Sequence, residues 1–491
     1  MIFSPSAARP WTFRRFASLA LCLAACASHA QIKYSTNSDN TLTVLGYNGT
    51  VRNLVIPATV NSYPVVAIAS NAFAANVGLN SVSVPDTVTN IGDYAFNYCS
   101  GLTNAFLGYG VATIGNFAFY MCVNLPGVTL PDTVTNLGAS AFADCIRLSS
   151  LVLPDSILTM GKAAFEDCQI TTVATPSGLV SIGAQTFYAC SSLTNITVST
   201  AVTNLGAQAF GACAALKSVF FRGNAPAADS ATFVSDAQAT AYYIPGAAGW
   251  SNSFASLPAQ PLYTYLTNNQ TITLTGYTAP WGDAVLPARI NGLPVTSIGD
   301  HAFASSGPSS VFIPETITNL GPYAFDNCAN LSCVILPNSI SVIPAGAFNF
   351  CDRLTNLTIP PGVMAINYMA IANCHNLASV FFRGNAPSGN GFGSDPRCSI
   401  YFLPGALGWG ASQLQPRAIL WNPLLQIPAP DSNQINLEIV GGSNLPIVLE
   451  SAPRLAAPHW TALASANLTN GSFHFQDSAT APARFYRIRS P

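Results

Sequence analysis

Hydrophobic and polar positions alternate in short segments that recur at a nearly fixed distance along the chain. In "LNSVSVP" at 79–85, apolar residues stand at positions 79, 82 and 84, polar residues stand at 80, 81 and 83, and Pro85 closes the segment. This alternation predicts a short strand with one buried face. In the following "DTVTNIGDYAF" at 86–96, the apolar residues at 88, 91, 95 and 96 predict a compact return path that packs against the same interior.

The phenylalanine of each "AF" pair shows the period of this pattern most clearly. It occurs in two series, at 73, 96, 119, 142, 165, 187 and 210 and again at 303, 325 and 348, with Ile371 at the next step. A constant step of 22 or 23 residues is typical of a solenoid, in which each coil buries its apolar face only by stacking on its neighbours. We therefore expect equivalent side chains, Phe96, Phe119 and Phe142 among them, to lie in one column.

Longer segments repeat as well, and they predict the domain organisation. Tyr47 and Tyr277 each precede the first phenylalanine of a series by the same distance, and "SVFFRGNAP" occurs at 218–226 and at 379–387. Because an open solenoid end exposes apolar surface, these segments are expected to cap two arrays, at 31–262 and 263–423. The short alternating segments after Pro423 predict a small all-β, sandwich-like module at 424–491.

The repeat resembles a known family of proteins. L-x-x-V-x-V-P followed by I-G-x-x-A-F-x-x-C, seen over roughly 42–225 and 272–387, resembles the BspA-like class of bacterial leucine-rich repeats. Gly108, Pro344 and Ile371 depart from the pattern locally. The resemblance implies a strand plus a turn or short helix in each coil, and a non-catalytic role in adhesion or recognition. The final module resembles one found on many secreted bacterial proteins, which ends in a similar aromatic–arginine run.

The first thirty residues have the composition of an export signal. Arg9, Arg14 and Arg15 precede the apolar run "FASLALCLAACA", and "SHA" stands before Gln31. This pattern predicts a signal peptide at 1–30 that is cleaved after Ala30. The alternative is lipidation of Cys26, because "LAAC" resembles the lipobox of bacterial lipoproteins. Either route predicts a secreted or cell-surface protein, and any membrane attachment would be through that lipid.

Composition and charge narrow the range of partners. Charged residues make up only 8% of the chain, 49% is hydrophobic and the formal net charge is −2. Such a chain has enough apolar residues to fold, but it has no basic patch for nucleic acid or anionic lipid. A surface made of neutral hydroxyl and amide groups favours neutral extracellular partners.

The cysteines keep the repeat spacing. They occupy equivalent positions at 99, 122, 145, 168, 190 and 213 and at 328, 351 and 374. Neighbouring coils lie about 5 Å apart, a distance that allows a disulfide or metal ladder. Equivalent side chains point in parallel, however, and no C-x-x-C zinc spacing is present. The expected structure is a column of reduced, buried thiols, without metal or cofactor.

Residues suited to catalysis are few. Beyond residue 30 the chain has only His301, His375, His459 and His474, four glutamates, and no motif of a nucleophile, metalloprotease or phosphate loop. Aspartates recur after the strand-ending proline at 86, 132 and 155, which favours a role in turns. A glycosidase-like pair of carboxylates across coils is the alternative. We expect no catalytic residues.

The outward strand face is the predicted ligand-binding surface. Its candidate residues are polar or aromatic, and they are Asn80, Ser81, Asn104, Phe106, Thr194, Asn195, Phe220, Arg222, Asn356, Phe381 and Arg383. The simpler interpretation is that any half-exposed sheet is polar on its outer side. Likewise Arg222, Arg383, Trp250 and Trp409 form either a ligand pocket at each exit or a lid on the last coil, with the arginines bonded to loop carbonyls.

These observations predict a monomeric, non-catalytic binding or adhesion protein whose partner is an extracellular protein or glycan. One alternative is an accessory or catalytic component of extracellular polysaccharide breakdown. A second is a structural envelope protein. The family-level part of this prediction is an analogy of fold.

Overall fold

The computed structural model describes residues 31–236, 238–280, 282–389, 391–392, 398–411, 418–426, 434–441, 445–452, 460–468, 471–478 and 485–489. The chain divides into two compact units, residues 1–262 and 263–491. The predicted signal peptide with Cys26, and also His459, lie outside the described residues.

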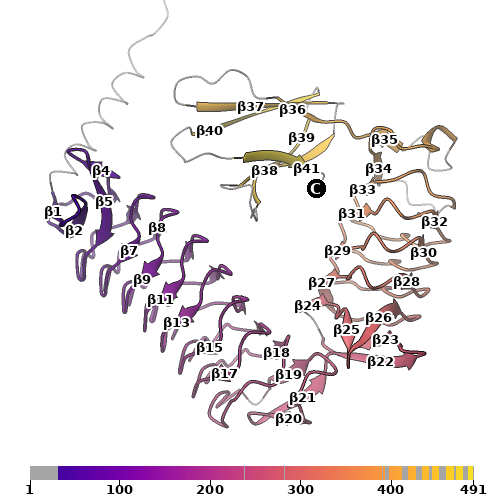
Figure 1. The fold of residues 1–491 in the computed structure, drawn as a ribbon, viewed down its shortest axis with the longest axis horizontal. Helices are drawn as coiled ribbons and strands as arrows, with labels where there is room; N and C mark the ends of the chain where they lie inside the picture. Colours follow the sequence, from indigo (N-terminus) through magenta and orange to yellow (C-terminus); the bar gives the residue numbers. More distant parts are fainter. Residues whose placement is uncertain are drawn as a thin grey trace, which may run out of the picture. The chain divides into compact units, whose positions relative to one another are not determined.

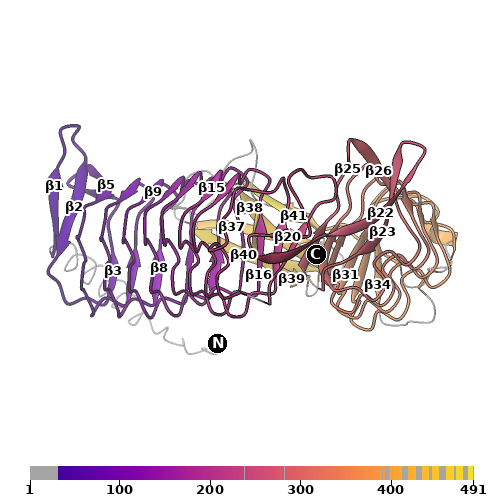
Figure 2. The same ribbon diagram turned by 90° about the horizontal axis from the view of Figure 1, so that it is seen from below.

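Most coils of the first unit contribute one short strand to each of two sides of the solenoid, where it pairs in parallel with the strands of neighbouring coils (Figure 1). On each side the pairing is interrupted once, between β12 and β14 and between β13 and β15. Figure 2 shows these sheets on different sides of the coils, with β3 and β8 on one side and β5 and β9 on the other. The first side, here called the strand face, consists of β3 (Asn53–Val55), β6 (Ser81–Ser83), β8 (Asn104–Phe106), β10 (Gly127–Thr129), β12 (Ser150–Val152), β14 (Thr172–Ala174), β16 (Asn195–Val198), β18 (Ser218–Phe221), β19 (Thr240–Tyr243) and β21 (Leu257–Pro261). The other side consists of β5 (Tyr63–Ile68), β7 (Asn90–Ile91), β9 (Thr113–Ile114), β11 (Asn136–Leu137), β13 (Thr159–Met160), β15 (Ser181–Ile182) and β17 (Asn204–Leu205).

The phenylalanine column is confirmed. From Phe73 to Phe210 and on to Phe233, successive rings stack with centroids 4.9–5.6 Å apart and interplanar angles of 1–12°. Phe96, Phe119 and Phe142 have no exposed surface. Phe233, which the repeat pattern had not identified, adds an eighth ring in the exit segment.

The return path is made of turns, so of the two predicted alternatives the short helix is absent from the coils that the structure describes. The backbone N–H groups explain why. Phe96 donates to the carbonyl of Ala118 at 2.7 Å and Tyr98 donates to that of Tyr120 at 2.8 Å, each in the next coil. Bonds that run between coils leave none of these donors for a helical ladder within the segment. Each coil is therefore stabilised by its neighbour.

The repeated glycine after the second strand is explained by close approach of the backbones. A Cβ atom added to Gly138 would lie 2.4 Å from the backbone nitrogen of Asn116 and from the carbonyl carbon of Gly115 in the preceding coil. No side chain fits at that distance, so glycine sets the coil-to-coil contact here.

Dedicated segments begin and end the first array. It begins with the antiparallel pair β1 (Ile32–Thr36) and β2 (Leu42–Tyr47), and β4 (Thr59–Val60) pairs with β5. The Tyr47 ring lies 6.2 Å from Phe73, at the start of the ring column. At the exit, next to β20 (Ser253–Phe254), the indole of Trp250 stacks on Tyr243 at 4.8 Å and donates to the Gly223 carbonyl at 3.2 Å. Trp250 is thus the predicted lid.

The second unit repeats this plan with fewer coils. It starts with the antiparallel strands β22 (Tyr263–Asn268) and β23 (Thr271–Tyr277), and the ring of Tyr277 stacks 5.6 Å from Phe303. Its strand face consists of β24 (Gly282–Val285), β27 (Pro308–Phe312), β29 (Cys333–Ile335), β31 (Asn356–Ile359), β33 (Ser379–Phe382), β34 (Ser399–Phe402) and β35 (Ala418–Leu420). The remaining strands are β25 (Arg289–Ile290), β26 (Leu293–Ile298), β28 (Asn319–Leu320), β30 (Val342–Ile343) and β32 (Ala365–Ile366), and a short 3₁₀ turn, η1, covers Trp409–Ala411.

The C-terminal module contains two three-stranded antiparallel sheets that share one apolar cluster, as expected of a small sandwich. The sheets are β36 (Leu424–Gln426), β37 (Gln434–Val440) and β40 (Ser472–Ser478), and β38 (Pro446–Ala452), β39 (Thr461–Asn467) and β41 (Phe485–Arg489). The terminal aromatic–arginine run has a structural use. Arg487 and Arg489 bind the buried carboxylate of Glu450 at 2.7 and 2.6 Å. Burial alone would raise the pKa of Glu450, but these two bonds hold it below its usual value.

Candidate functional site

Parallel register arranges the outward side chains of the strand face in two columns. Asn53 pairs with Ser81 and then Asn104, so one column is polar. The neighbouring column runs through Val55, Ser83, Phe106, Thr129 and Val152. The first column offers hydrogen-bonding groups and the second offers apolar contacts.

The second column is more apolar than the sequence indicated. The side chains of Val55, Phe106 and Val152 are 56%, 62% and 78% exposed. Of these three, sequence reasoning had selected only Phe106. The signal that could have identified Val55 and Val152 is their register with Phe106. Ser83 and Thr129 alternate with these three side chains, so an exposed apolar group recurs on every second strand, and we call Val55, Phe106 and Val152 the apolar stripe.

The predicted polar residues of the first array lie on the strand face. Asn80 and Asn104 are exposed, while Ser81, Thr194 and Asn195 are half-buried. Several also bond within the sheet: the Ser81 hydroxyl donates to Asn53 at 2.9 Å, and the Thr194 hydroxyl donates to the Thr171 carbonyl at 3.0 Å. These bonds hold the side chains flat against the sheet.

The prediction that Phe220 and Phe381 are exposed binding residues is wrong, although their register keeps both in the outward column of the strand face. Phe220 is only 2% exposed and its ring stacks on Tyr242 at 5.5 Å. Phe381 is 4% exposed, stacks on Tyr401 at 4.9 Å, and joins the apolar cluster of the C-terminal module. The aromatic rings near each exit thus pack in the structure. Asn356, two coils before the exit of the second array, is half-buried.

The exit tryptophans belong to caps, while the predicted bonds from the arginine side chains to loop carbonyls stay a prediction. Arg222 is half-buried and Arg383 is exposed, and their backbone N–H groups each bond to the preceding coil at 3.0 Å. Trp409 is 3% exposed, stacks on Phe402 at 4.8 Å, and donates to the Gly384 carbonyl at 3.4 Å. This geometry matches Trp250 in the first array and supports the lid interpretation over an exit pocket.

The cysteine column is buried, as predicted. In the first array, each cysteine from 99 to 213 has no exposed surface, and its sulfur donates to the carbonyl of the preceding coil's phenylalanine at 3.1–3.3 Å. Burial raises the pKa of Cys99 and of Cys190 to about 12. A thiol with such a pKa forms little thiolate at neutral pH and is a poor nucleophile.

We therefore expect iodoacetamide to leave these six cysteines unlabelled in the native protein and to label all of them in denaturant. Cys333, which is exposed on β29, is the internal control and should react under native conditions. Peptide mass spectrometry after each treatment measures the labelling of the six buried cysteines and of Cys333. Ready native labelling of the six would contradict the buried column.

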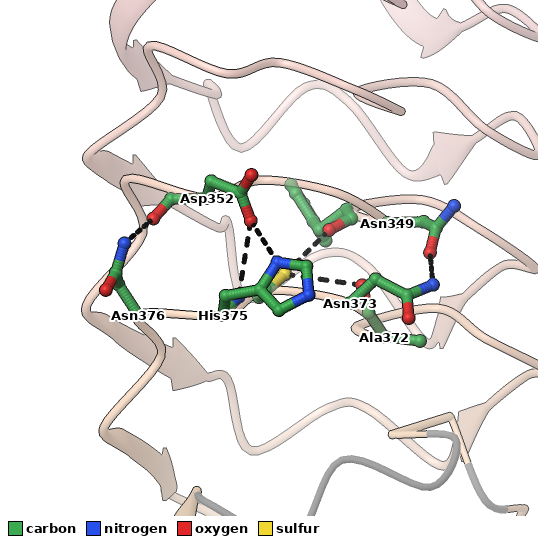
Figure 3. Close-up of polar contacts among 8 residues, drawn as sticks. Asn349, Asp352, Ala372, Asn373, His375 and Asn376 are labelled. Carbon is green, nitrogen blue, oxygen red and sulfur yellow. Dashed lines mark hydrogen bonds and ion pairs between the residues drawn. The ribbon is translucent and has the colours of Figure 1, made fainter.

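His375 forms a polar cluster on the surface of the second array that the sequence did not predict (Figure 3). Its Nδ1 lies 2.7 Å from a carboxylate oxygen of Asp352 in the preceding coil, and both side chains are about half exposed. The adjacent Cys374 is buried, with its sulfur 3.0 Å from the Phe348 carbonyl. The imidazole and the thiol therefore lie on opposite sides of the chain, an arrangement unsuited to a histidine-activated cysteine.

The recurrent aspartates at 86, 132 and 155 lie in turns, as predicted, and the carboxylates of two of them also link successive coils. Asp86 accepts from the backbone N–H of Tyr109 and Asp155 accepts from that of Ser177, both at 2.8 Å. Glu315 has the same function in the second array, where it accepts from Asn338. These carboxylates are already used by backbone donors of the next coil.

Neither a metal site nor a membrane span is found within the described ranges. They contain no group of three or more histidine, cysteine, aspartate or glutamate side chains placed to hold a metal ion. No helix there has the length and apolar character to cross a bilayer.

Stacked coils with one outward strand face define the leucine-rich-repeat class of solenoids. The profile described as the BspA type leucine rich repeat region matches six copies, over residues 66–178, 112–240 and 290–388, more than half of the chain. The chain belongs to this family.

Solved structures with similar repeats come from several bacteria. A leucine-rich repeat protein of Treponema pallidum is 30% identical over 38% of this chain and 88% of its own, with a TM-score of 0.36. A leucine-rich cell surface protein of Faecalibacterium prausnitzii is 25% identical over 74% and 94%, with a TM-score of 0.38. One from Bacteroides ovatus is 20% identical over 79% and 97%, with a TM-score of 0.33. No curated protein sequence matches the chain.

Proposed function

We propose that the protein is an exported, non-catalytic adhesion or recognition protein whose first-array strand face binds another protein. The observation that carries this proposal is the stripe formed by Val55, Phe106 and Val152 beside the polar column. Exposed apolar side chains in register, with hydrogen-bonding groups alongside, suit a protein surface. Export would follow signal cleavage after Ala30 or lipidation of Cys26, which mass spectrometry of the mature N-terminus would distinguish.

The electrical neutrality of the surface supports this proposal. From β3 to β16, the outward strand positions carry amide, hydroxyl, apolar or glycine residues and no charge. A neutral face avoids the desolvation of unpaired charges when a partner covers it. Membership of a family whose relatives include a cell surface protein supports an extracellular location.

The test is a binding screen of the purified monomeric protein against extracellular proteins and glycans, followed by variants of the stripe. Phe106→Ala combined with Val152→Ser should weaken binding of the retained protein at least about tenfold, because exposed anchors at the centre of a face contribute most of the affinity. Surface plasmon resonance measures the change.

Leu158→Ser is the matched control, since Leu158 is 56% exposed next to the other sheet. It should leave the affinity within about twofold. Equal binding by all variants would refute the strand-face proposal. Retention of a glycan, lost with Phe106→Ala, would instead favour the polysaccharide-binding alternative, and hydrolysis of a glycan would refute a non-catalytic role.

A further inference from the structure

The turn segments of the first array carry a second surface feature, distinct from the strand face. Four aromatic side chains gather on the turns that follow β7 and β9, and we call Tyr94, Tyr98, Phe117 and Tyr120 the aromatic cluster. Tyr94 and Phe117 stack with centroids 4.9 Å apart at 5°, and Tyr120 meets both Phe117 and Tyr98 edge-on at 5.6 Å. The four rings form one continuous group.

The fold does not require aromatic residues at these positions. Tyr94, Tyr98 and Phe117 have left-handed backbones, with φ of 59°, 57° and 55°. The residues at the equivalent positions of the first-array coils, from Asn71 to Ala212, have the same conformation. The other coils of this array place small or polar residues there, such as Ser140 and Ala163. Bulky side chains are unfavourable in this region of φ, so the concentration of rings in two adjacent coils is a property of this surface rather than of the repeat.

Carboxylates flank the rings on the next two coils. We call Asp144, Glu166 and Asp167 the acidic cluster. Burial, and also the charge of Asp144, raise the pKa of Glu166 and of Asp167, and Asp167 adds to the shift at Glu166. Backbone hydrogen bonds place the two clusters on successive coils, since Met121 donates to the Ala143 carbonyl at 3.0 Å and Asp144 donates to the Glu166 carbonyl at 2.9 Å. Burial, and then the neighbouring Asp144, raise the pKa of the Tyr120 phenol to about 12. Within the part of the chain that the structure describes, no ion pair involves any of the three acids.

We infer that the aromatic and acidic clusters together bind a basic segment of a partner protein. Ring faces attract guanidinium and ammonium groups, and the neighbouring carboxylates supply the opposite charge. Charge complementarity selects this occupant, because the acidic cluster has three carboxylates and only Lys162 lowers the pKa of one of them. This surface is separate from the neutral strand face and would operate whether or not that face binds a partner.

The experiment measures the affinity of an oligo-arginine peptide by titration calorimetry, with oligo-lysine, choline and calcium as comparison ligands. Tyr94→Ser with Phe117→Ser should raise the Kd for oligo-arginine about tenfold, and Asp144→Asn with Glu166→Gln should do the same. Binding should weaken as salt is added, because exposed charges are screened. Asp144→Asn alone provides a milder variant, and thermal unfolding verifies that each variant is folded.

Tyr323→Ser is the matched control. Tyr323 occupies the equivalent left-handed position in the second array and stacks on His301 at 5.1 Å. It should leave the Kd within about twofold. Absence of peptide binding, equal binding by all variants, or binding of choline or calcium alone would overturn the inference. Loss in the carboxylate variants only would overturn the role of the rings.

Discussion

Replacing Phe142 by alanine should lower the free energy of unfolding of the first array by about 3–5 kcal/mol. Its ring has no exposed surface and stacks between Phe119 and Phe165, at 5.1 and 5.6 Å. Truncation removes both contacts and leaves a cavity in the interior that adjacent coils share. In a solenoid the loss falls on the interfaces with both neighbours, because each coil is stabilised by the next.

Chemical denaturation followed by circular dichroism measures this effect. Phe106→Ala is the matched control, since Phe106 is the same residue type one coil earlier and is 62% exposed. It should change the free energy of unfolding by no more than about 0.5 kcal/mol. If the two variants lost similar amounts of unfolding free energy, the ring column would not be the main source of stability.

The second large effect is expected at Asp236, which occupies the cysteine position in the exit coil. It follows Phe233 by three residues, as Cys213 follows Phe210. The carboxyl is 4% exposed, and both of its oxygens are buried without a hydrogen-bond partner. Burial raises its pKa from 3.8 to about 7, against a smaller opposing effect of the Cys213 backbone.

This shift makes the folded state bind the proton more tightly than the unfolded state. Its stabilising effect is therefore complete below pH 4 and is lost as the pH rises from 4 to about 7. The shift corresponds to a loss of up to about 4 kcal/mol across that range. Asp236→Cys should remove this dependence and stabilise the protein at pH 8, because a thiol can donate to the Phe210 carbonyl as the others do in their coils.

Denaturation between pH 4 and 8 tests this prediction. Asp132→Asn is the control, since Asp132 is exposed on an earlier coil, and it should leave the slope of stability with pH unchanged. If the stability of the wild-type protein does not fall between pH 4 and 8, the buried Asp236 carboxyl does not have a raised pKa.

The candidate site was predicted only in part, and the failures have one cause. Polar residues such as Asn104 were placed on the strand face correctly, because alternation assigns the side of a strand. Phe220 and Phe381 obey the same alternation but are covered, the second by the C-terminal module. Whether an outward residue of the strand face stays exposed depends on segments that are distant in sequence, and alternation does not identify them. The aromatic and acidic clusters were missed because their members come from four successive coils and are brought together only by stacking of those coils.

The repeat itself determined the solenoid, the phenylalanine and cysteine columns, and the division of each coil into an inner and an outer side. A period carries this information, since one coil cannot bury its apolar face alone. Tertiary structure alone decided that the return path is a turn, that aspartates join successive coils, and which outward residues stay exposed. Each of these depends on backbone and side-chain contacts between coils or modules, and alternation along a single strand does not encode them.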